Sequence, residues 1–484
     1  MKTKMRKISC AIIFLSFIII LEGLFCNGET EENIAKMEKT EKYNLYYGIQ
    51  GFVGDWWNGS DLYPDPCGWT PIQGVSCDLL DGFWYVTDLN IGPLHDNSLT
   101  CAQFPQFRSH IFHLKHLKSL SFYNCFSSHH LITLPTDIWA NLGSTLESLE
   151  FRSNPSLVGP IPLSFGDLKM LRSLVIVENG ISGNLPSNIG NLRQLKRLVL
   201  SGNKFTGRIT ETIGGLSELL ILDLSRNSLS GYIPFSIGYL NSLLKLDLSN
   251  NFLMGQIPIE MGKLKNLTLL DLRSNNLSGG FTRSIEEINS LEELILANNQ
   301  IGGEITNFNW ENLQNLMILD LSNVGLSGEI PKSTAKLKKL RYLGLNNNNF
   351  TGNLPIELAN MPCVSSIYVN GNNLTGAINF SEGSYGKLGS KFKAGENPNL
   401  CYIGGIISSE HAPIGVDPCK SDEISGISGS ASGLSNEPGR LQQKLINPNI
   451  NSSFGFGLLR RGITGIWSIF VLEFLSMIFV IGFY

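Results

Sequence analysis

The amino-acid sequence predicts an α/β solenoid, a stack of coils in which each coil contributes one short strand. The first observation is spacing, because asparagines recur every 24 residues from Asn203 to Asn299 within the frame Leu-x-Leu-x-x-Asn-x-hydrophobic-x-Gly. The second is that the strand leucines of one coil, such as Leu222 and Leu224, can be buried only against stacked neighbours. The third is that a buried asparagine amide can pair with backbone groups that a turn leaves unpaired.

The repeat extends beyond this central stretch on both sides. One extra residue within 306–310 shifts the register, so that Val324 occupies the asparagine position with Asn323 beside it. From a strand near Leu120 to a strand near Ile367 we count about eleven repeats, and at roughly 4.8 Å per strand their inner face runs about 50 Å. The asparagine column comprises Asn154, Asn179, Asn203, Asn227, Asn251, Asn275, Asn299, Asn348 and Asn372, with Cys125 at its N-terminal end.

A Gly-x-Ile/Leu-Pro segment follows the column at a fixed offset. This segment resembles the plant extracellular class of leucine-rich repeat, in which the family adds a second short strand after the first. The resemblance therefore implies a plant-type leucine-rich-repeat horseshoe, with the prolines at edge positions of the second strand. The segments are 159–162, 183–186, 231–234, 255–258, 328–331 and 352–355.

Composition and the N-terminal segment predict a secreted protein. Charged residues make up 16% of the chain and the formal net charge is −4, so no basic field indicates a nucleic-acid partner. Basic residues within 2–7 precede the apolar run 8–25, which is typical of a signal peptide over 1–28.

Removal of that peptide leaves seven cysteines in an oxidising compartment, six of them near the ends of the array. A solenoid exposes apolar layers at both ends, so disulfide-stapled end caps are expected. Sequence proximity favours three pairs, although the four early cysteines allow three connectivities. Cys363, next to the strand expected to begin at Val364, is predicted to be a buried structural thiol. The pairs are Cys67–Cys77, Cys101–Cys125 and Cys401–Cys419.

The N-terminal cap carries the most specific resemblance. Residues 46–93, above all the runs 57–61 and 68–77, resemble plant leucine-rich-repeat receptor-like proteins, and the resemblance is expected to cover nearly the whole chain. It implies a cell-surface protein that supports a root's response to a beneficial endophytic fungus and promotes growth. Its implied partners are a receptor-like kinase or co-receptor and a peptide or protein ligand. Independently, Leu45, Ile49 and Phe52 have the spacing of an amphipathic helix that covers the first repeat.

The residues after Cys419 predict membrane attachment without a kinase domain. Only 65 residues remain, and they contain no Gly-x-Gly-x-x-Gly or His-Arg-Asp signature. The apolar tail 462–484 contains Glu473 and has no basic residue after it, which favours a lipid-anchor signal over a transmembrane helix, and both interpretations stay open. The predicted organisation is signal peptide 1–28, N-terminal cap and irregular repeat 29–110, repeats 111–390, C-terminal cap 391–420, Ser/Gly-rich stalk 421–461 and tail 462–484.

Two sets of polar residues were weighed as modification or metal sites. Seven Asn-x-Ser/Thr sequons predict a glycoprotein. The histidines near His110, His113 and His116 lack any metal-ligand frame, so neither a metal nor a cofactor is expected. The sequon asparagines are Asn58, Asn266, Asn276, Asn349, Asn373, Asn379 and Asn451.

Three function classes follow: a cell-surface receptor without a kinase, an inhibitor of microbial cell-wall-degrading enzymes, and a wall carbohydrate enzyme. The first is favoured, and no catalytic residues are expected. Strand alternation points one set of residues outward on the concave face, where an acidic row, an apolar group and two tyrosines are candidate contacts. They are Val175, Val177, Arg197, Val199, Ile221, Asp223, Asp247, Asp271, Arg273, Asp320, Tyr342 and Tyr368.

Overall fold

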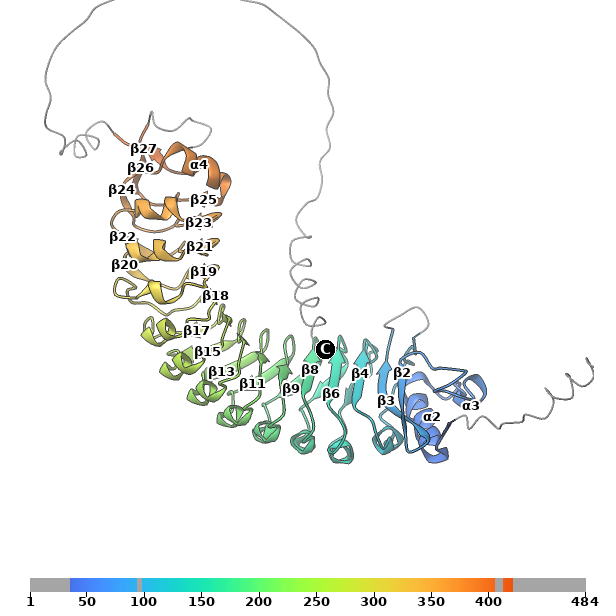
Figure 1. The fold of residues 1–484 in the computed structure, drawn as a ribbon. Helices are drawn as coiled ribbons and strands as arrows, with labels where there is room; N and C mark the ends of the chain where they lie inside the picture. The colour runs from blue at the N-terminus through green and yellow to red at the C-terminus, as the bar shows by residue number, and fades with distance from the viewer. Residues whose placement is uncertain (1–34, 94–97, 405–411, 421–484) are drawn as a thin grey trace, which may run out of the picture. The chain divides into compact units, whose positions relative to one another are not determined.

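The computed structural model describes residues 35–93, 98–404 and 412–420. Within them, the chain forms a continuous stack of coils, with strands on the inner side and short 3-10 helices on the outer side (Figure 1). No helix in this described part is long and apolar enough to cross a membrane. The predicted signal peptide, stalk, tail and Asn451 sequon lie outside the described residues.

The main sheet takes one strand from each coil. Fifteen strands belong to it, and apart from β2, which pairs antiparallel with β3, the pairing is parallel. Eleven strands run from β4 to β23. The strands are β1 (Lys36–Met37), β2 (Val75–Leu80), β3 (Phe83–Ile91), β4 (Ser119–Tyr123), β6 (Ser148–Arg152), β8 (Ser173–Val177), β10 (Arg197–Val199), β12 (Ile221–Asp223), β14 (Lys245–Asp247), β16 (Leu269–Asp271), β18 (Glu293–Ile295), β19 (Ile318–Asp320), β21 (Tyr342–Gly344), β23 (Ser366–Tyr368) and β25 (Phe392–Lys393).

The core lies between the strands and the outer 3-10 helices. The repeat leucines, for example Leu222 and Leu246, are fully buried and stack on one another through the in-register pairing of β12 with β14. Burying one such side chain contributes about 1.5 to 3 kcal/mol, and this burial exists only when the neighbouring coil is folded. The solenoid predicted from the leucine spacing is therefore confirmed.

A second, lateral sheet is present, as the resemblance implied, but its strands end within one residue of the first glycine of each Gly-x-Ile/Leu-Pro segment, so most of each segment follows its strand. Seven strands belong to it, and β20 and β22 form a separate pair. The expected edge position of the prolines is wrong: Pro234, for example, follows β13 and precedes a 3-10 helix, where its missing N–H is not needed. The strands are β5 (Ile132–Thr133), β7 (Leu157–Gly159), β9 (Gly180–Gly183), β11 (Lys204–Gly207), β13 (Ser228–Tyr232), β15 (Phe252–Gly255), β17 (Asn276–Leu277), β20 (Ser327–Glu329) and β22 (Asn349–Thr351).

Short 3-10 helices form the outer layer. They are η1 (Ser109–His113), η2 (Ile138–Leu142), η3 (Leu163–Asp167), η4 (Ser187–Asn191), η5 (Glu211–Gly215), η6 (Phe235–Tyr239), η7 (Ile259–Lys263), η8 (Arg283–Glu287), η9 (Trp310–Asn312), η10 (Lys332–Lys336) and η11 (Ile356–Asn360). All but η10, whose buried residue is Thr334, place an apolar residue in the core, such as Ile213, Ile237 or Met261.

The asparagine column binds the turns of adjacent coils together. The Asn251 side-chain amide donates to the carbonyl oxygens of Leu224, Leu248 and Ser249 at 3.0, 3.1 and 3.1 Å, and its Oδ1 accepts from the Leu229 N–H at 3.0 Å. The same pattern recurs along the column and continues to Asn397, which the sequence analysis missed. The repeat frame is present in residues 392–397, with Phe392 and Ala394 in place of the two leucines. This frame could therefore have identified Asn397 from the sequence.

The register shift is absorbed at one turn. Asn323 adopts a left-handed conformation with φ 52°, the same role that Asn298 has one coil earlier, and this leaves Val324 buried in the column. Asn348 compensates by accepting two N–H groups, from Val324 at 3.2 Å and from Leu326 at 3.0 Å. Asn348 thus holds the N–H of the valine that replaces the asparagine as well as the N–H that it accepts in the regular pattern.

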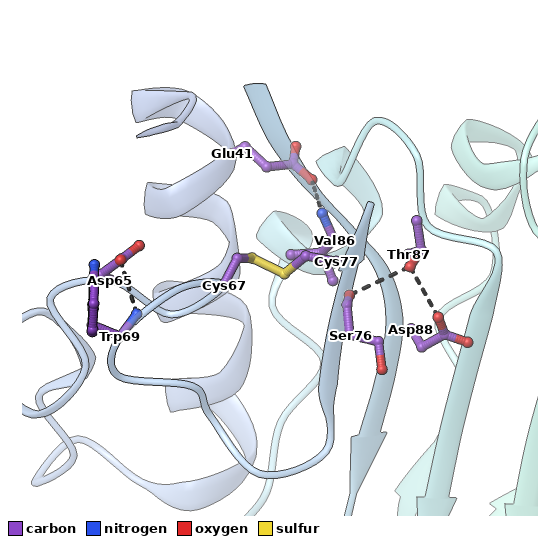
Figure 2. The surroundings of a disulfide bond; sticks show 9 residues. All are labelled: Glu41, Asp65, Cys67, Trp69, Ser76, Cys77, Val86, Thr87 and Asp88. Atoms are coloured by element: carbon purple, nitrogen blue, oxygen red, sulfur yellow. Dashed lines mark hydrogen bonds between the residues drawn. A yellow bond between two sulfur atoms is a disulfide. The ribbon is translucent and has the colours of Figure 1, made fainter. Parts of the chain in front are cut away.

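The N-terminal cap consists of α2 (Lys39–Val53), which packs on β3 and on η1 of the first coil, and α3 (Gly59–Leu62), which packs on α2. The predicted amphipathic face is confirmed, because Leu45, Ile49 and Phe52 are fully buried. Figure 2 shows Glu41 of α2 directed at the Val86 N–H of β3, and the Cys67–Cys77 disulfide beside it. Burial raises the pKa of the Glu41 carboxyl.

Disulfides close both caps, and all three expected pairs are present: Cys67–Cys77, Cys101–Cys125 and Cys401–Cys419. The C-terminal cap adds α4 (Glu382–Leu388), η12 (Gly389–Lys391) and a sheet of β24 (Thr375–Ile378), β26 (Asn399–Tyr402) and β27 (Asp417–Pro418). The prediction for Cys363 is wrong, because the thiol is free and exposed. The strand beside it begins at Ser366 rather than Val364, so Cys363 lies in the preceding turn.

Candidate ligand-binding face

We call the side of the main sheet that faces away from the core the concave face. The register between its strands arranges the side chains of this face in rows. In-register pairing aligns Asp223 with Asp247 and Asp271, then with Ile295 and Asp320. Parallel strands are about 4.8 Å apart, so these carboxylates form a narrow line. We call Asp223, Asp247, Asp271 and Asp320 the acidic column.

Backbone hydrogen bonds fix each carboxylate of the acidic column. Oδ1 of every member accepts the N–H of the residue two positions later, at 2.9 Å for Asp223 and Asp247 and at 3.0 Å for Asp271 and Asp320. Each Oδ1 is therefore held by its own strand end. The second oxygen of Asp271 pairs with the Arg273 Nε at 3.1 Å.

Burial and mutual repulsion disfavour the charged forms of the central members. Burial raises the pKa of Asp271 to about 7, and the Asp247 charge adds to the rise, whereas Arg273 opposes it. Burial and the Asp223 charge likewise raise the pKa of Asp247. A cationic group placed over the column would relieve this repulsion, so the column favours cationic ligands.

Replacing Asp271 with asparagine should stabilise the protein at pH 8 and leave its stability unchanged at pH 4. Because the folded-state pKa is raised to about 7, wild type gains a proton on folding between the unfolded pKa and this value, and the associated stability is lost as pH rises through it. The difference at pH 8 should reach up to about 4 kcal/mol, since each pKa unit corresponds to about 1.4 kcal/mol. Urea unfolding of both proteins across this pH range measures it. A destabilised variant at pH 8 would mean that pairing with Arg273 outweighs burial.

The apolar group expected on this face is largely closed. Val175 is fully buried and Val199 is 7% exposed, while Val177 and Ile221 are half-buried. The physical reason is strand spacing, because a short side chain between close strands is covered by longer neighbours. The prediction of an open hydrophobic patch at Val175 and Val199 is therefore wrong.

Charged groups dominate the surface at these early coils. Arg152 pairs with Glu150 at 2.9 Å, and Glu150 is in register with the buried Val175. Arg197 is half-buried, its Nε has no hydrogen-bond partner among the described residues, and burial lowers its pKa. Arg197 thus buries a donor atom that no described group satisfies.

Two tyrosines mark the other end of the concave face. Tyr342 and Tyr368 are half-buried and meet edge to face with ring centroids 5.5 Å apart. Gly344, in register between Asp320 and Tyr368, leaves no side chain between the acidic column and this tyrosine pair. Lys393, which the sequence analysis did not single out, lies with its Nζ 4.8 Å from the Tyr368 ring centroid. The end of the face therefore combines aromatic surface with a cation.

We found no second cluster of polar side chains, comparable to the acidic column, among the described residues. Two of the three histidines considered in the sequence contact different aromatic rings: His110 contacts Tyr47 and His116 contacts Tyr85. No group of three His, Cys, Asp or Glu residues that could hold a metal occurs among the described residues. A hollow of about 1120 Å³ crosses the lateral side of the last coils, lined by Pro331, Pro355 and the sequon residue Asn379.

Sequence comparisons identify the repeats and relate the chain to plant receptor-like proteins. Two leucine rich repeat family models match, one at residues 193–253 and the other at 339–361. The chain is 55% identical to Piriformospora indica-insensitive protein 2 of Arabidopsis thaliana over 176 residues, which cover 35% of this chain and 41% of that protein. It is 35% identical to the Arabidopsis thaliana protein TOO MANY MOUTHS over 155 residues, covering 30% of this chain and 29% of that protein. The chain thus aligns with less than half of each relative, which is narrower than the resemblance expected from the sequence.

Solved structures of plant receptor ectodomains share the fold. The plant peptide hormone receptor RGFR1 in complex with RGF2 is 28% identical, with a TM-score of 0.54, over 61% of this chain and 46% of that chain. The leucine-rich-repeat ectodomain of the Arabidopsis receptor kinase HAESA, in complex with an extended IDA peptide hormone, is 31% identical, with a TM-score of 0.53, over 61% of this chain and 48% of that chain.

Proposed function

Because the chain is a plant leucine-rich-repeat protein, we propose that it is a kinase-less cell-surface receptor that binds an extended polypeptide on its concave face. The bound polypeptide is presented to a receptor-like kinase or co-receptor, which supplies the signal. The proposal extends to attachment at the membrane through the tail 462–484 and to a role in a root's response to a beneficial fungus, which rests on the name of the 55% identical relative.

The observation that carries the proposal is the arrangement of the concave face. The acidic column offers a line of in-register carboxylates, two of which have raised pKa values that a cationic ligand would lower again. The tyrosine pair lies on the next two strands after that of Asp320 and supplies aromatic surface of the kind enriched in protein interfaces. A polypeptide lying across the strands with basic residues over the column, and an apolar residue against the tyrosines, fits both features. The peptide-bound receptor ectodomains of the same fold support this class of ligand.

We expect the double variant Asp223→Lys with Asp247→Lys to lose binding to its ligand and kinase partner, with at least a tenfold weaker affinity. Two charge reversals opposite a cationic ligand remove attraction and add repulsion, and placing like charges against each other costs several kcal/mol. Secreted protein carrying a cleavable tag is used to capture crosslinked partners from root membranes, and the captured kinase is then titrated against each purified variant. Tyr342→Ala with Tyr368→Ala tests the aromatic end separately.

The matched control is Glu211→Lys with Glu218→Lys. These residues are exposed on the outer side, and the control changes the net charge by the same amount. Val175 and Val199 are unsuitable positions for a charge, because both are buried and the change would test folding. Binding that survives the concave variants but fails in the control would move the contact to the outer or lateral surface and overturn the proposal.

A further inference from the structure

An apolar patch lies on the outward face of the lateral sheet near the middle of the array. Tyr232 of β13 is 62% exposed, and Phe252 and Met254 of β15 are 65% and 42% exposed. Tyr232 and Met254 are register partners, and Phe252 lies two residues before Met254, so all three side chains share the outward face of the sheet. We call these three residues the lateral patch.

The lateral patch departs from the repeat pattern rather than following it. The positions that correspond to Phe252 and Met254 in the preceding coil are Ser228 and Ser230, and Tyr232 corresponds to Arg208. The Tyr232 ring also lies over β15, since a Cβ added to Gly255 would clash with its Cδ1. Adjacent exposed aromatic side chains on a monomer call for a covering group.

A sequon lies directly beside the lateral patch. Asn276 of β17 is exposed, begins the triplet Asn276-Leu-Ser278, and is the register partner of Met254. Adjacent strands are about 4.8 Å apart, so a sugar on Asn276 starts within one strand of Met254 and two of Tyr232. The other sequons on the lateral sheet lack this setting: Asn349, for example, is in register with Ser327.

The Asn276 side chain is already oriented for such a sugar. Its Oδ1 accepts a hydrogen bond of 2.8 Å from Gln300 Nε2, which lies on the next coil, on the side away from β15. The Asn276 Nδ2 itself makes no hydrogen bond with a described residue, and Asn276 is exposed, so this nitrogen is available for attachment. In contrast, Nδ2 of the sequon residue Asn266 donates to the Asn241 carbonyl at 3.0 Å.

We propose that an N-linked glycan on Asn276 folds over the lateral patch, and that the apolar face of its first N-acetylglucosamine packs on Tyr232, Phe252 and Met254. Attachment joins Nδ2 to the anomeric carbon of the sugar, while Nδ2 loses one proton and the lipid diphosphate of the oligosaccharide donor leaves. The Oδ1 bond to Gln300 is unaffected by this chemistry. The glycan thus acts as a covalently tethered part of the surface, and the inference rests on the secretory route in the proposed function.

Hydroxyl-radical footprinting of the secreted, glycosylated protein tests this cover. We expect Asn276→Gln to increase oxidation of Met254 and Tyr232 severalfold over wild type, because removal of the sugar opens both side chains to solvent. Ser278→Ala, which removes the sequon but keeps Asn276, should give the same increase, and Ser278→Thr should not. Met261 is fully buried and should stay protected throughout, which verifies that each variant is folded.

Asn349→Gln is the matched control, since it removes a sequon at the same place in another coil, beside polar neighbours. It should leave Met254 unchanged, as should the concave charge reversals that test ligand binding, so the two proposals fail independently. Equal oxidation of Met254 in wild type and Asn276→Gln would overturn the proposal. So would an unmodified Asn276 peptide in the mass spectrum, or a patch that closes only when a protein partner is added.

Discussion

Replacing Asn251 with alanine should lower the free energy of unfolding by about 2 to 4 kcal/mol. The change leaves the buried N–H of Leu229 without a partner and removes the bonds from the amide to the carbonyl oxygens of Leu224, Leu248 and Ser249. These three carbonyl oxygens each keep a second donor, from Asn227, Asn275 and Arg226, so the largest single cost is the unpaired N–H, about 1 to 3 kcal/mol. Equilibrium unfolding in urea measures the change. A loss below 1 kcal/mol would mean that the coils hold their turns without the asparagine column.

Asn191→Ala is the control for this experiment. Asn191 ends η4 on the outer side and is exposed, so its replacement should change the unfolding free energy by no more than about 0.5 kcal/mol. A comparison with Asn251→Ala therefore separates the loss of an amide inside the column from the loss of an amide at the surface.

Cys67→Ser should destabilise the N-terminal cap by about 2 to 4 kcal/mol, because the disulfide to Cys77 no longer restricts the unfolded chain. The apolar face of α2 covers the first coil, so loss of the cap exposes this coil and should lower the yield of secreted protein. The melting temperature and the secreted amount report both effects.

Cys363→Ser is the internal comparison, since this thiol is exposed and makes no disulfide. It should leave melting and secretion unchanged. If Cys67→Ser melts like wild type, the cap is held by packing of α2 alone.

The fold could be predicted because the features that build it repeat. Stacked leucines and the buried amides of the asparagine column require the same residue types in every coil, so periodicity exposes them directly. The cap pairs could be predicted because the cysteines that pair lie close in sequence, with separations of 10, 24 and 18 residues.

Surface exposure could not be predicted with the same success. Alternation correctly placed Val175 and Val199 on the outward side of their strands, but it does not describe how far the neighbouring side chains cover them. Cys363 shows the opposite error, since burial was predicted and the thiol is exposed. It lies in the turn before β23, which begins only at Ser366. The lateral patch was missed because it arises from register between coils, which links Met254 with Asn276 across 22 residues of sequence.

The interruption of the lateral sheet marks the point where we expect the array to bend, and we call this point the joint. The main sheet passes through β16, β18 and β19 without a gap, whereas the lateral sheet ends at β17 and resumes at β20, with only isolated bridges between. Because only the main sheet is continuous at this point, we expect the array to bend there more easily than elsewhere. The acidic column spans this joint, with Asp271 before it and Asp320 after it. A ligand that contacted both carboxylates would therefore restrict bending at the joint, and its length would set the angle between the two halves of the stack.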